Sequence, residues 1–187
     1  MKYIVTLLYV FLIIPSAASA ADMQVPFESE LQNLIKNYNR VTPTLATSGT
    51  ISAGAVKELA EKGFATIIDL RTENEGTAEE KKNVESAGMI YINIPVTGAG
   101  INHKQLAVFT KAIENARAPI LMHCASGNRV GALWTTYRLS KGINSKIAFE
   151  EGRTAGMKPL LEEKIRASCQ TCRRRVLPRL AVGGGCS

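Results

Sequence analysis

Apolar residues recur along this chain in two alternating patterns, short continuous runs and longer stretches with helical spacing. The short runs predict strands over 64–70, 89–94 and 120–122, with a further edge strand ending at Thr47-Ser48-Gly49. The helical spacing predicts amphipathic helices around 31–38, 55–60, 77–88, 102–113 and 130–137. Such alternation is typical of an α/β domain, so we expect three layers, with a mostly parallel central sheet and helices on both of its faces.

Polar residues mark where three of these helices begin. Ser52 and Asn102 each precede a helical stretch and can cap it. Thr77 and Glu80 stand three positions apart, which is the spacing of a capping box. We therefore expect helices to begin at these three places.

The first twenty residues have the composition of an export signal. Lys2 precedes an apolar segment over 3–14, which is shorter than the roughly 20 residues that span a bilayer. The small residues of Ala18-Ser19-Ala20 favour cleavage before Ala21. We therefore expect residues 1–20 to be a signal peptide and the mature protein to be periplasmic or secreted; an uncleaved membrane anchor is the alternative.

Positive charge is concentrated at the end of the chain. The sequence has 23 Lys+Arg and 16 Asp+Glu, and residues 158–187 alone hold seven basic and two acidic residues. We expect residues 21–157 to form one domain that is nearly neutral, which predicts no specific nucleic-acid partner. Residues 158–187 are expected to be a basic tail, solvated and frayed, capable of weak contact with an anionic membrane surface.

Four cysteines are present, and three of them fall in the basic tail. Cys169-Gln170-Thr171-Cys172 is a CxxC without the strand-to-helix context of a redox site or a second pair for zinc. Export permits disulfides, so we expect a local disulfide or incidental thiols there. The pattern predicts no metal and no cofactor.

An anion-binding loop is predicted where the chain reads His123-Cys124-Ala125-Ser126-Gly127-Asn128-Arg129. A helix N-terminus and a guanidinium favour the thiolate form of a cysteine, which is its nucleophilic form. Backbone N–H groups from Ala125 to Val130 can converge on an oxyanion. Gly127 supplies the backbone freedom that such a turn needs, and Arg129 can bind two oxygens of a phosphate ester.

Several segments together resemble a known family over roughly residues 41–157. They are Thr47-Ser48-Gly49, Ile67-Ile68-Asp69-Leu70-Arg71, Tyr91-Ile92-Asn93-Ile94-Pro95-Val96 and the loop from His123 to Arg129. In this order they resemble the dual-specificity protein tyrosine phosphatases. The closer resemblance is to their bacterial offshoot, the phosphatase-like domain of beta-lactamase-hydrolase-like proteins.

The resemblance implies a phosphatase-like fold and a cysteine-dependent hydrolysis of phosphate monoesters, phosphotyrosine among them, without a metal. By this resemblance Cys124 is the nucleophile, which forms a phosphocysteine, and Arg129 is the phosphate clamp. His123 holds the loop and helps to keep Cys124 ionised. His123, the loop residues Ala125 to Asn128 and Val130 are the expected substrate-binding residues, and the substrate is a phosphorylated protein or a small molecule.

Two departures from the family pattern keep a second activity open. Four residues separate Cys124 from Arg129, whereas tyrosine phosphatases have five, and Val130 stands where phosphatases place Ser or Thr. Four is also the spacing of many rhodanese-like sulfurtransferases, which would carry a persulfide on Cys124. The stretch from Gly88 to Pro95 favours the phosphatase, because it lacks the sulfurtransferase pattern Gly-His-Ile-Pro-Gly-Ala.

The general acid is not evident from the sequence. Related phosphatases carry an aspartate just after the equivalent of Ile94-Pro95-Val96, where this chain has Thr97-Gly98-Ala99-Gly100. Glu73, Glu75 and His103 are candidates, whereas Asp69 is expected to make structural hydrogen bonds. An enzyme without a good acid should prefer acidic leaving groups such as aryl alcohols. A non-catalytic anion-binding module is the third hypothesis.

Overall fold

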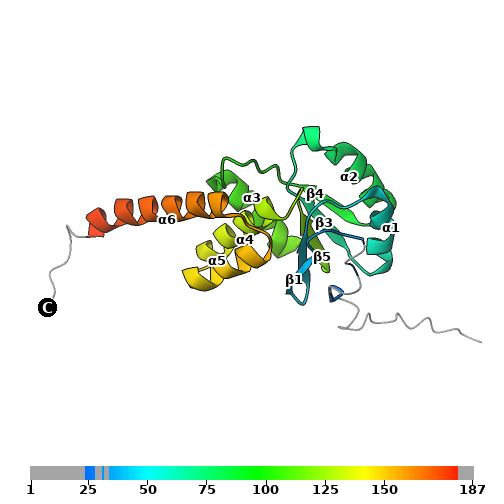
Figure 1. Cartoon of the computed structure of the whole chain (residues 1–187), viewed down its shortest axis with the longest axis horizontal. Coiled ribbons are helices and arrows are strands. Elements are labelled where there is room, and N and C mark those ends of the chain that lie inside the picture. The colour runs from blue at the N-terminus through cyan, green and yellow to red at the C-terminus, as the bar shows by residue number, and fades with distance from the viewer. Residues whose placement is uncertain (1–23, 28–30, 32–33, 181–187) are drawn as a thin grey trace, which may run out of the picture.

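A five-stranded sheet lies at the centre of the molecule (Figure 1). This computed structural model describes residues 24–27, 31 and 34–180. The strand order is β1-β2-β5-β3-β4, with β1 antiparallel to β2 and the other described pairs parallel. The strands are β1 (Asn39–Thr42), β2 (Leu45–Ser48), β3 (Thr66–Asp69), β4 (Ile90–Asn93) and β5 (Ile120–His123). The predicted α/β class with a mostly parallel sheet is confirmed.

Helices cover both faces of this sheet (Figure 1). They are α1 (Ala53–Glu61), α2 (Thr77–Ser86), α3 (His103–Asn115), α4 (Asn128–Ser140), α5 (Ser145–Thr154) and α6 (Pro159–Leu180), with a 3-10 turn η3 (Glu73–Glu75). Side chains of α1 and α2 belong to one buried cluster, and those of α3 and α4 belong to another. The three predicted layers are therefore present.

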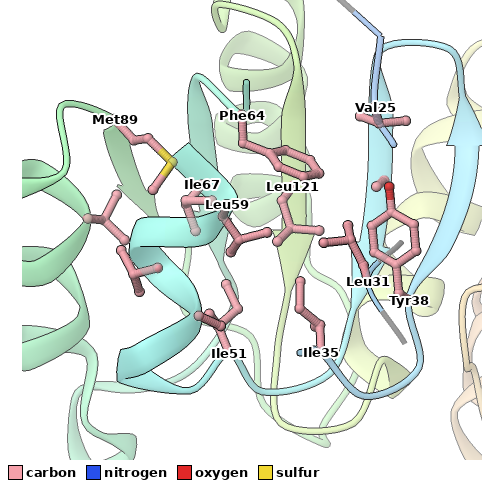
Figure 2. Close-up of a cluster of buried hydrophobic side chains, with 14 residues drawn as sticks. Val25, Leu31, Ile35, Tyr38, Ile51, Leu59, Phe64, Ile67, Met89 and Leu121 are labelled. Carbon is pink, nitrogen blue, oxygen red and sulfur yellow. The ribbon is translucent and has the colours of Figure 1, made fainter. Parts of the chain in front are cut away.

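The alternation of side chains along β5 separates the two clusters. Leu121 packs against α1 and the segment before β1, in the cluster that Figure 2 shows. Met122 and Cys124 point the other way and pack with residues of α3 and α4, such as Phe109 and Leu133. Because successive strand residues face opposite sides, the chain changes face between His123 and Cys124.

The described residues before β1 form no helix, contrary to the expectation for 31–38. Leu31, Ile35 and Tyr38 are buried, but Ile35 makes a β-bridge with Ile51. Asn37 has a φ of 54°, a left-handed conformation that ends any helical run. The apolar spacing was therefore a signal of burial and not of helix.

The strand that ends at Ser48 is an inner strand, so its prediction as an edge strand was wrong. β2 pairs with β5 on one side and with β1 on the other. Four residues, Asn39–Thr42, form β1, and three of them are polar. Such a short and polar strand gives almost no apolar signal in the sequence.

Helix starts follow the predictions in part. Asn102 caps α3, since its side chain accepts from Gln105 N. Ser52 precedes α1 without a side-chain cap. α2 does begin at Thr77, but its N-cap is Gly76 and the predicted Thr77–Glu80 capping box is absent. Glu80 instead points into the interior, with 7% of its surface exposed.

The last two helices pack on α4. A side chain at Gly152 of α5 would meet Thr135 Oγ1 of α4 at 1.9 Å, so this crossing requires glycine. α6 follows and buries Leu161 and Ile165 against α4 and α5. The segment expected to be frayed is therefore helical up to residue 180.

The proposed export signal, residues 1–20, lies outside the described residues. Within the part that the structure describes, no helix combines the length and apolar character of a membrane span. Cys169 lies exposed on α6, whereas the Cys172 side chain and Cys186 lie outside what the structure describes.

Candidate active site

The predicted anion-binding loop lies at the carboxyl end of β5, the middle strand of the sheet. It connects β5 to the first turn of α4. The loop is held from the side of β2, because Thr50 donates to Ala125 O through N and Oγ1, at 3.3 and 3.0 Å, and Gly49 bridges to Ser126. In open α/β sheets ligands bind at this end of the strands.

Gly127 fulfils the role that the sequence predicted for it. Its φ is 86°, and a Cβ atom there would lie 2.6 Å from Ala155 O. A side chain is therefore excluded both by the backbone conformation and by the segment after α5. The turn can tighten only because the residue is glycine.

Cys124 is fully buried, but its sulfur has polar surroundings on the loop side. The backbone N–H of Gly127 donates to Cys124 Sγ at 3.2 Å. This N–H belongs to the N-cap residue of α4, so the sulfur lies at the positive end of a helix. A donated N–H and a helix N-terminus are both features that stabilise a thiolate.

Arg129 turns inward, with 14% of its side chain exposed. Its Nη1 donates to Glu75 Oε2 at 2.8 Å and to Val96 O at 3.1 Å, and its Nη2 donates to Glu75 Oε1 at 2.6 Å. The hydrogen bonds to Glu75, together with the charge of the nearby Cys124, raise the pKa of Arg129. The cysteine and the arginine of the loop therefore face one another.

Glu75 is the fixed partner of Arg129, which excludes it as the general acid. The hydrogen bonds from Arg129 lower the pKa of Glu75 to about 2, and Thr72 contributes through its N and Oγ1. A carboxyl group with this pKa is ionised at neutral pH and has no proton to give. The sequence-based candidacy of Glu75 was wrong in this respect.

His123 lies on the opposite face of the sheet from Cys124 and is fully buried. Its Nε2 lies 2.7 Å from Glu80 Oε1 and 3.6 Å from Asp69 Oδ1. The side chain therefore does not line the loop. Its predicted role in holding the loop rests on its position at the end of β5, and it stays a prediction.

A buried ion-pair cluster surrounds His123, and Arg71 is its centre. Arg71 donates to Asp69 through Nε and Nη2, and its Nη2 also lies 2.7 Å from Glu80 Oε2. Burial opposes the ionisation of Asp69, but hydrogen bonds from Arg71 and Tyr91 lower its pKa overall. The structural role predicted for Asp69 is confirmed, whereas Arg71 is buried and does not rim the site.

One group of three described residues could offer ligands to a metal ion, namely Asp69, Glu80 and His123. Their ligand atoms lie within 4.8 Å of one another. The guanidinium of Arg71 already bridges the two carboxylates and supplies the compensating positive charge. The donor set therefore fits an internal ion-pair cluster better than a metal site.

The loop at 97–102 carries no carboxylate, as its sequence indicated. It is fixed by Gln105, whose side chain donates to Pro95 O, and by Lys164 of α6, whose Nζ donates to Gly98 O at 2.6 Å. His103 lines a cavity between this loop and α6, whose lining includes neither Cys124 nor Arg129. Proton donation by Glu73 or His103 stays a prediction.

The remaining predicted loop residues differ in their exposure. Ala125 is exposed, Ser126 and Asn128 are half-buried, and Val130 is buried at the start of α4. Asn128 accepts from Lys158 N at 2.8 Å, which ties the loop to the start of α6. Their binding of a substrate is untested and stays a prediction.

A mostly parallel α/β sheet with a Cys-X4-Arg loop on its middle strand fits both a phosphatase-like and a rhodanese-like domain, and the family comparison decides for the phosphatase-like class. The chain belongs to the family of the beta-lactamase hydrolase-like protein, phosphatase-like domain, whose family model matches residues 37–140. The Beta-lactamase hydrolase-like protein of Xylella fastidiosa is 30% identical over 121 residues. That alignment covers 62% of this chain and 27% of the relative, so the chain spans about a quarter of that protein.

Solved structures agree with this class. A candidate phosphatase of Shewanella putrefaciens CN-32 is 25% identical, with a TM-score of 0.58 over 73% of this chain and 95% of its own. A candidate phosphatase of Neisseria meningitidis Z2491 is 25% identical, with a TM-score of 0.57 over 67% and 89%. TpbA of P. aeruginosa, in complex with pTyr, shares 20% identity, 78% and 87% coverage and a TM-score of 0.57, which shows the fold alone. Family and neighbours together support a phosphatase.

Proposed function

We propose that this chain is a cysteine-dependent phosphatase that hydrolyses phosphate monoesters through a phosphocysteine at Cys124. One observation carries the proposal: Cys124 Sγ accepts a hydrogen bond at the start of α4 while the guanidinium of Arg129 lies turned in beside it. A thiolate and a bidentate cation at a helix N-terminus form a site for a tetrahedral dianion.

The reaction has two displacement steps. In the first, the thiolate attacks phosphorus, an S–P bond forms, and the P–O ester bond breaks with its electron pair moving to the leaving oxygen. In the second, water attacks phosphorus, the S–P bond breaks, and inorganic phosphate and the thiolate are released. Arg129 and the loop N–H groups stabilise the negative charge on the equatorial oxygens in both steps.

Aryl phosphates, phosphotyrosine among them, are the proposed substrate class. Glu75 is held ionised by Arg129, and the 97–102 loop has no carboxylate, so the leaving oxygen has no assigned proton donor. A phenol, with a pKa of about 10, leaves as an anion far more readily than an alkyl alcohol. Without a general acid, the enzyme should therefore prefer aryl phosphates to alkyl phosphates.

The proposed location is outside the cytoplasm, in the periplasm or beyond. It rests on the sequence pattern of residues 1–20 and on the expected cleavage before Ala21. The basic residues after Lys158 also support a weak contact with an anionic membrane surface. Phosphorylated proteins or small molecules in that compartment are then the proposed substrates.

Parallel assays on one preparation of the wild-type protein test the activity. We expect hydrolysis of a series of aryl phosphates, with a rate that falls steeply as the pKa of the leaving phenol rises. Thiosulfate and cyanide, the substrates of a sulfurtransferase, should give no thiocyanate. Thiocyanate formation without phosphate release would instead support the persulfide hypothesis, which the four-residue spacing of the loop motivates.

The anion-binding hypothesis is tested in the same preparation. It is motivated by Val130 and by the missing carboxylate after Val96. Binding of orthovanadate or phosphate without turnover of any ester would favour it over the enzyme. Hydrolysis that is equally fast for all leaving groups would contradict the proposed absence of a general acid.

A further inference from the structure

The hydrogen bonds of Arg129 divide its guanidinium into two parts. An arginine side chain has five N–H donors. Glu75 and the carbonyl of Val96 take both hydrogens of Nη1 and one of Nη2. Nη1 also lies 3.5 Å from Leu70 O. Nε and the second hydrogen of Nη2 take no part in these contacts, and the guanidinium also interacts with the Cys124 side chain. These two donors lie along one edge of the guanidinium, so they form a fork that suits two oxygens of an oxyanion.

Glu75 therefore binds the Nη1–Nη2 end of the Arg129 guanidinium, and a phosphate can bind the Nε–Nη2 edge. Its carboxylate contacts Nη1 and Nη2 at the end of the guanidinium, at 2.8 and 2.6 Å, and makes no hydrogen bond with Nε. A carboxylate that mimicked the substrate would instead compete for that edge. This geometry allows Glu75 to orient Arg129 without competing with the substrate for it.

The turn that carries Glu75 is anchored in the interior. Arg71 Nη1 donates to the backbone carbonyl of Glu75 at 3.1 Å. The same guanidinium binds Asp69 at the end of β3 and Glu80 of α2, with 8% of its side chain exposed. Buried groups with several partners have few alternative positions. The position of η3 is thus determined by the ends of the sheet.

The same cluster also reaches the strand that carries the nucleophile. Glu80 Oε1 lies 2.7 Å from His123 Nε2, and His123 directly precedes Cys124 in the chain. The buried ion-pair cluster around Arg71 therefore contacts the site from two directions. Arg71 binds the backbone of Glu75, which binds Arg129, and Glu80 contacts His123 at the end of β5.

We propose that Glu75 is a positioning residue, which holds the Nε–Nη2 edge of Arg129 toward the phosphorus during transfer and is itself held by Arg71. This proposal rests on the proposed phosphatase function. Stabilisation of a transition state depends on geometry, and a displacement of about 1 Å can cost about 100-fold in rate. The effect of Glu75 should therefore be larger on the transition state than on the bound ground state.

Glu75→Gln and Glu75→Asp test the proposal in the full-length protein. Gln removes the charge and one acceptor, whereas Asp keeps the charge but withdraws the carboxylate by one methylene group. For both variants we expect kcat to fall about 10- to 100-fold while KM changes by less than about threefold. A rate loss in Gln but not in Asp would show that only the charge matters and would overturn the proposal.

Binding measurements separate positioning from a general loss of structure. Orthovanadate resembles the transition state and inorganic phosphate resembles the product, so titration calorimetry with both gives their ratio of affinities. If Glu75 acted only through its negative charge, its removal would change the affinities for orthovanadate and for phosphate by the same factor. We expect the vanadate affinity of both Glu75 variants to fall at least fivefold more than the phosphate affinity. Equal losses would overturn the proposal.

Glu151→Gln is the matched control. Glu151 of α5 also pairs with an arginine of α4 through two hydrogen bonds, from Nε and Nη2 of Arg138 at 2.8 and 2.9 Å, and it lies outside the loop. This variant should keep kcat and the ratio of affinities within about twofold. A ratio that shifts as much in Glu151→Gln as in the Glu75 variants would contradict the special role of Glu75.

The link to Arg71 is tested by Arg71→Lys alone and combined with Glu75→Gln. If Arg71 acts through Glu75, the double variant should lose little more activity than the stronger single variant. Losses that multiply would overturn this part of the proposal. Should Arg71→Lys not fold, the Glu75 variants decide the proposal.

Binding and turnover by the wild-type protein distinguish failure of the proposed phosphatase function from failure of the positioning role. A wild-type protein that binds neither anion overturns both the phosphatase and the positioning role. A wild-type protein that binds vanadate without turnover contradicts the enzyme, and the affinity ratio of the Glu75 variants still decides the positioning role. An active wild type with unchanged Glu75 variants overturns the positioning role alone.

Discussion

At the scale of single residues, the end of β5 places two neighbours in opposite environments. Cys124 packs with α4 and accepts the N–H of Gly127, whereas His123 faces the ion-pair cluster of Arg71. The sequence indicated Cys124, Gly127 and Arg129, because each has a chemical reason to occupy its place in the loop. We did not predict that the His123 side chain points away from the loop. The alternation of side chains along a strand would have predicted it, because His123 and Cys124 are neighbours at the end of β5.

Gly127→Ala should destabilise the protein more than an ordinary turn glycine would. Its φ of 86° costs an alanine about 1–2 kcal/mol, and the added Cβ would lie 2.6 Å from Ala155 O. Urea unfolding measures the loss of free energy, and we expect it to exceed the conformational cost alone. Phosphate affinity should fall as well, because the amide of this residue contacts Cys124 Sγ.

Gly142→Ala is the matched control for this prediction. Gly142 has a similar φ of 77°, but an added Cβ there would meet nothing within 4 Å. We expect this variant to lose only about 1–2 kcal/mol. Equal losses for the two alanine variants would contradict the close approach between the loop and the segment after α5.

At the scale of elements, the segment between β3 and α2 differs most from its prediction. A capping box does form, but between Thr72 and Glu75, and not between Thr77 and Glu80. Both glutamates fit the local pattern equally well, and only tertiary partners decide between them. Glu80 does share a helical face with the buried Val84, and this spacing was the one sequence signal for an inward carboxylate.

The contact between η3 and α4 predicts a specific dependence of stability on pH. Arg129 lowers the pKa of Glu75 from 4.5 to about 2 in the folded protein. Since the folded value lies below the unfolded one, the pair contributes fully above about pH 5 and progressively less as the pH falls toward 2. The difference in unfolding free energy between wild type and Glu75→Gln should therefore be constant from pH 8 to 5.

Urea unfolding between pH 8 and pH 3 checks this expectation. The other carboxylates titrate in both proteins, so the difference isolates Glu75. We expect the difference to shrink between pH 5 and pH 3. A difference that stays unchanged over this range would show that Glu75 does not bind Arg129 as an ionised group.

At the scale of the whole molecule, the sequence was sufficient for the class of fold. β3 and β5 are buried along their whole length, and their apolar residues Ile67-Ile68 and Ile120-Leu121-Met122 are visible without the structure. The segment before β1 depends on partners further along the chain, such as Gly49 and Ile51, to which local patterns give no access. The start of α6 was missed because its charged residues concealed the spacing of Leu161 and Ile165.

The arrangement of the whole also explains why one site can form from distant segments. β5 brings Cys124, the turn after β3 brings Glu75, and the end of β4 is followed by Val96, whose carbonyl binds Arg129. Parallel strands end at the same edge, so these segments meet there although they are far apart in the sequence. We propose that Cys124 is the nucleophile of this site.

The most direct measurement of that claim is aryl-phosphate hydrolysis by Cys124→Ser, compared with Cys169→Ser and wild type. We expect Cys124→Ser to lose at least about 1000-fold in rate, because a neutral hydroxyl replaces the attacking thiolate. Its thermal unfolding should match that of wild type, and Cys169→Ser, which changes an exposed cysteine on α6, should keep full activity. A folded Cys124→Ser protein that hydrolyses aryl phosphates at the wild-type rate would contradict the account.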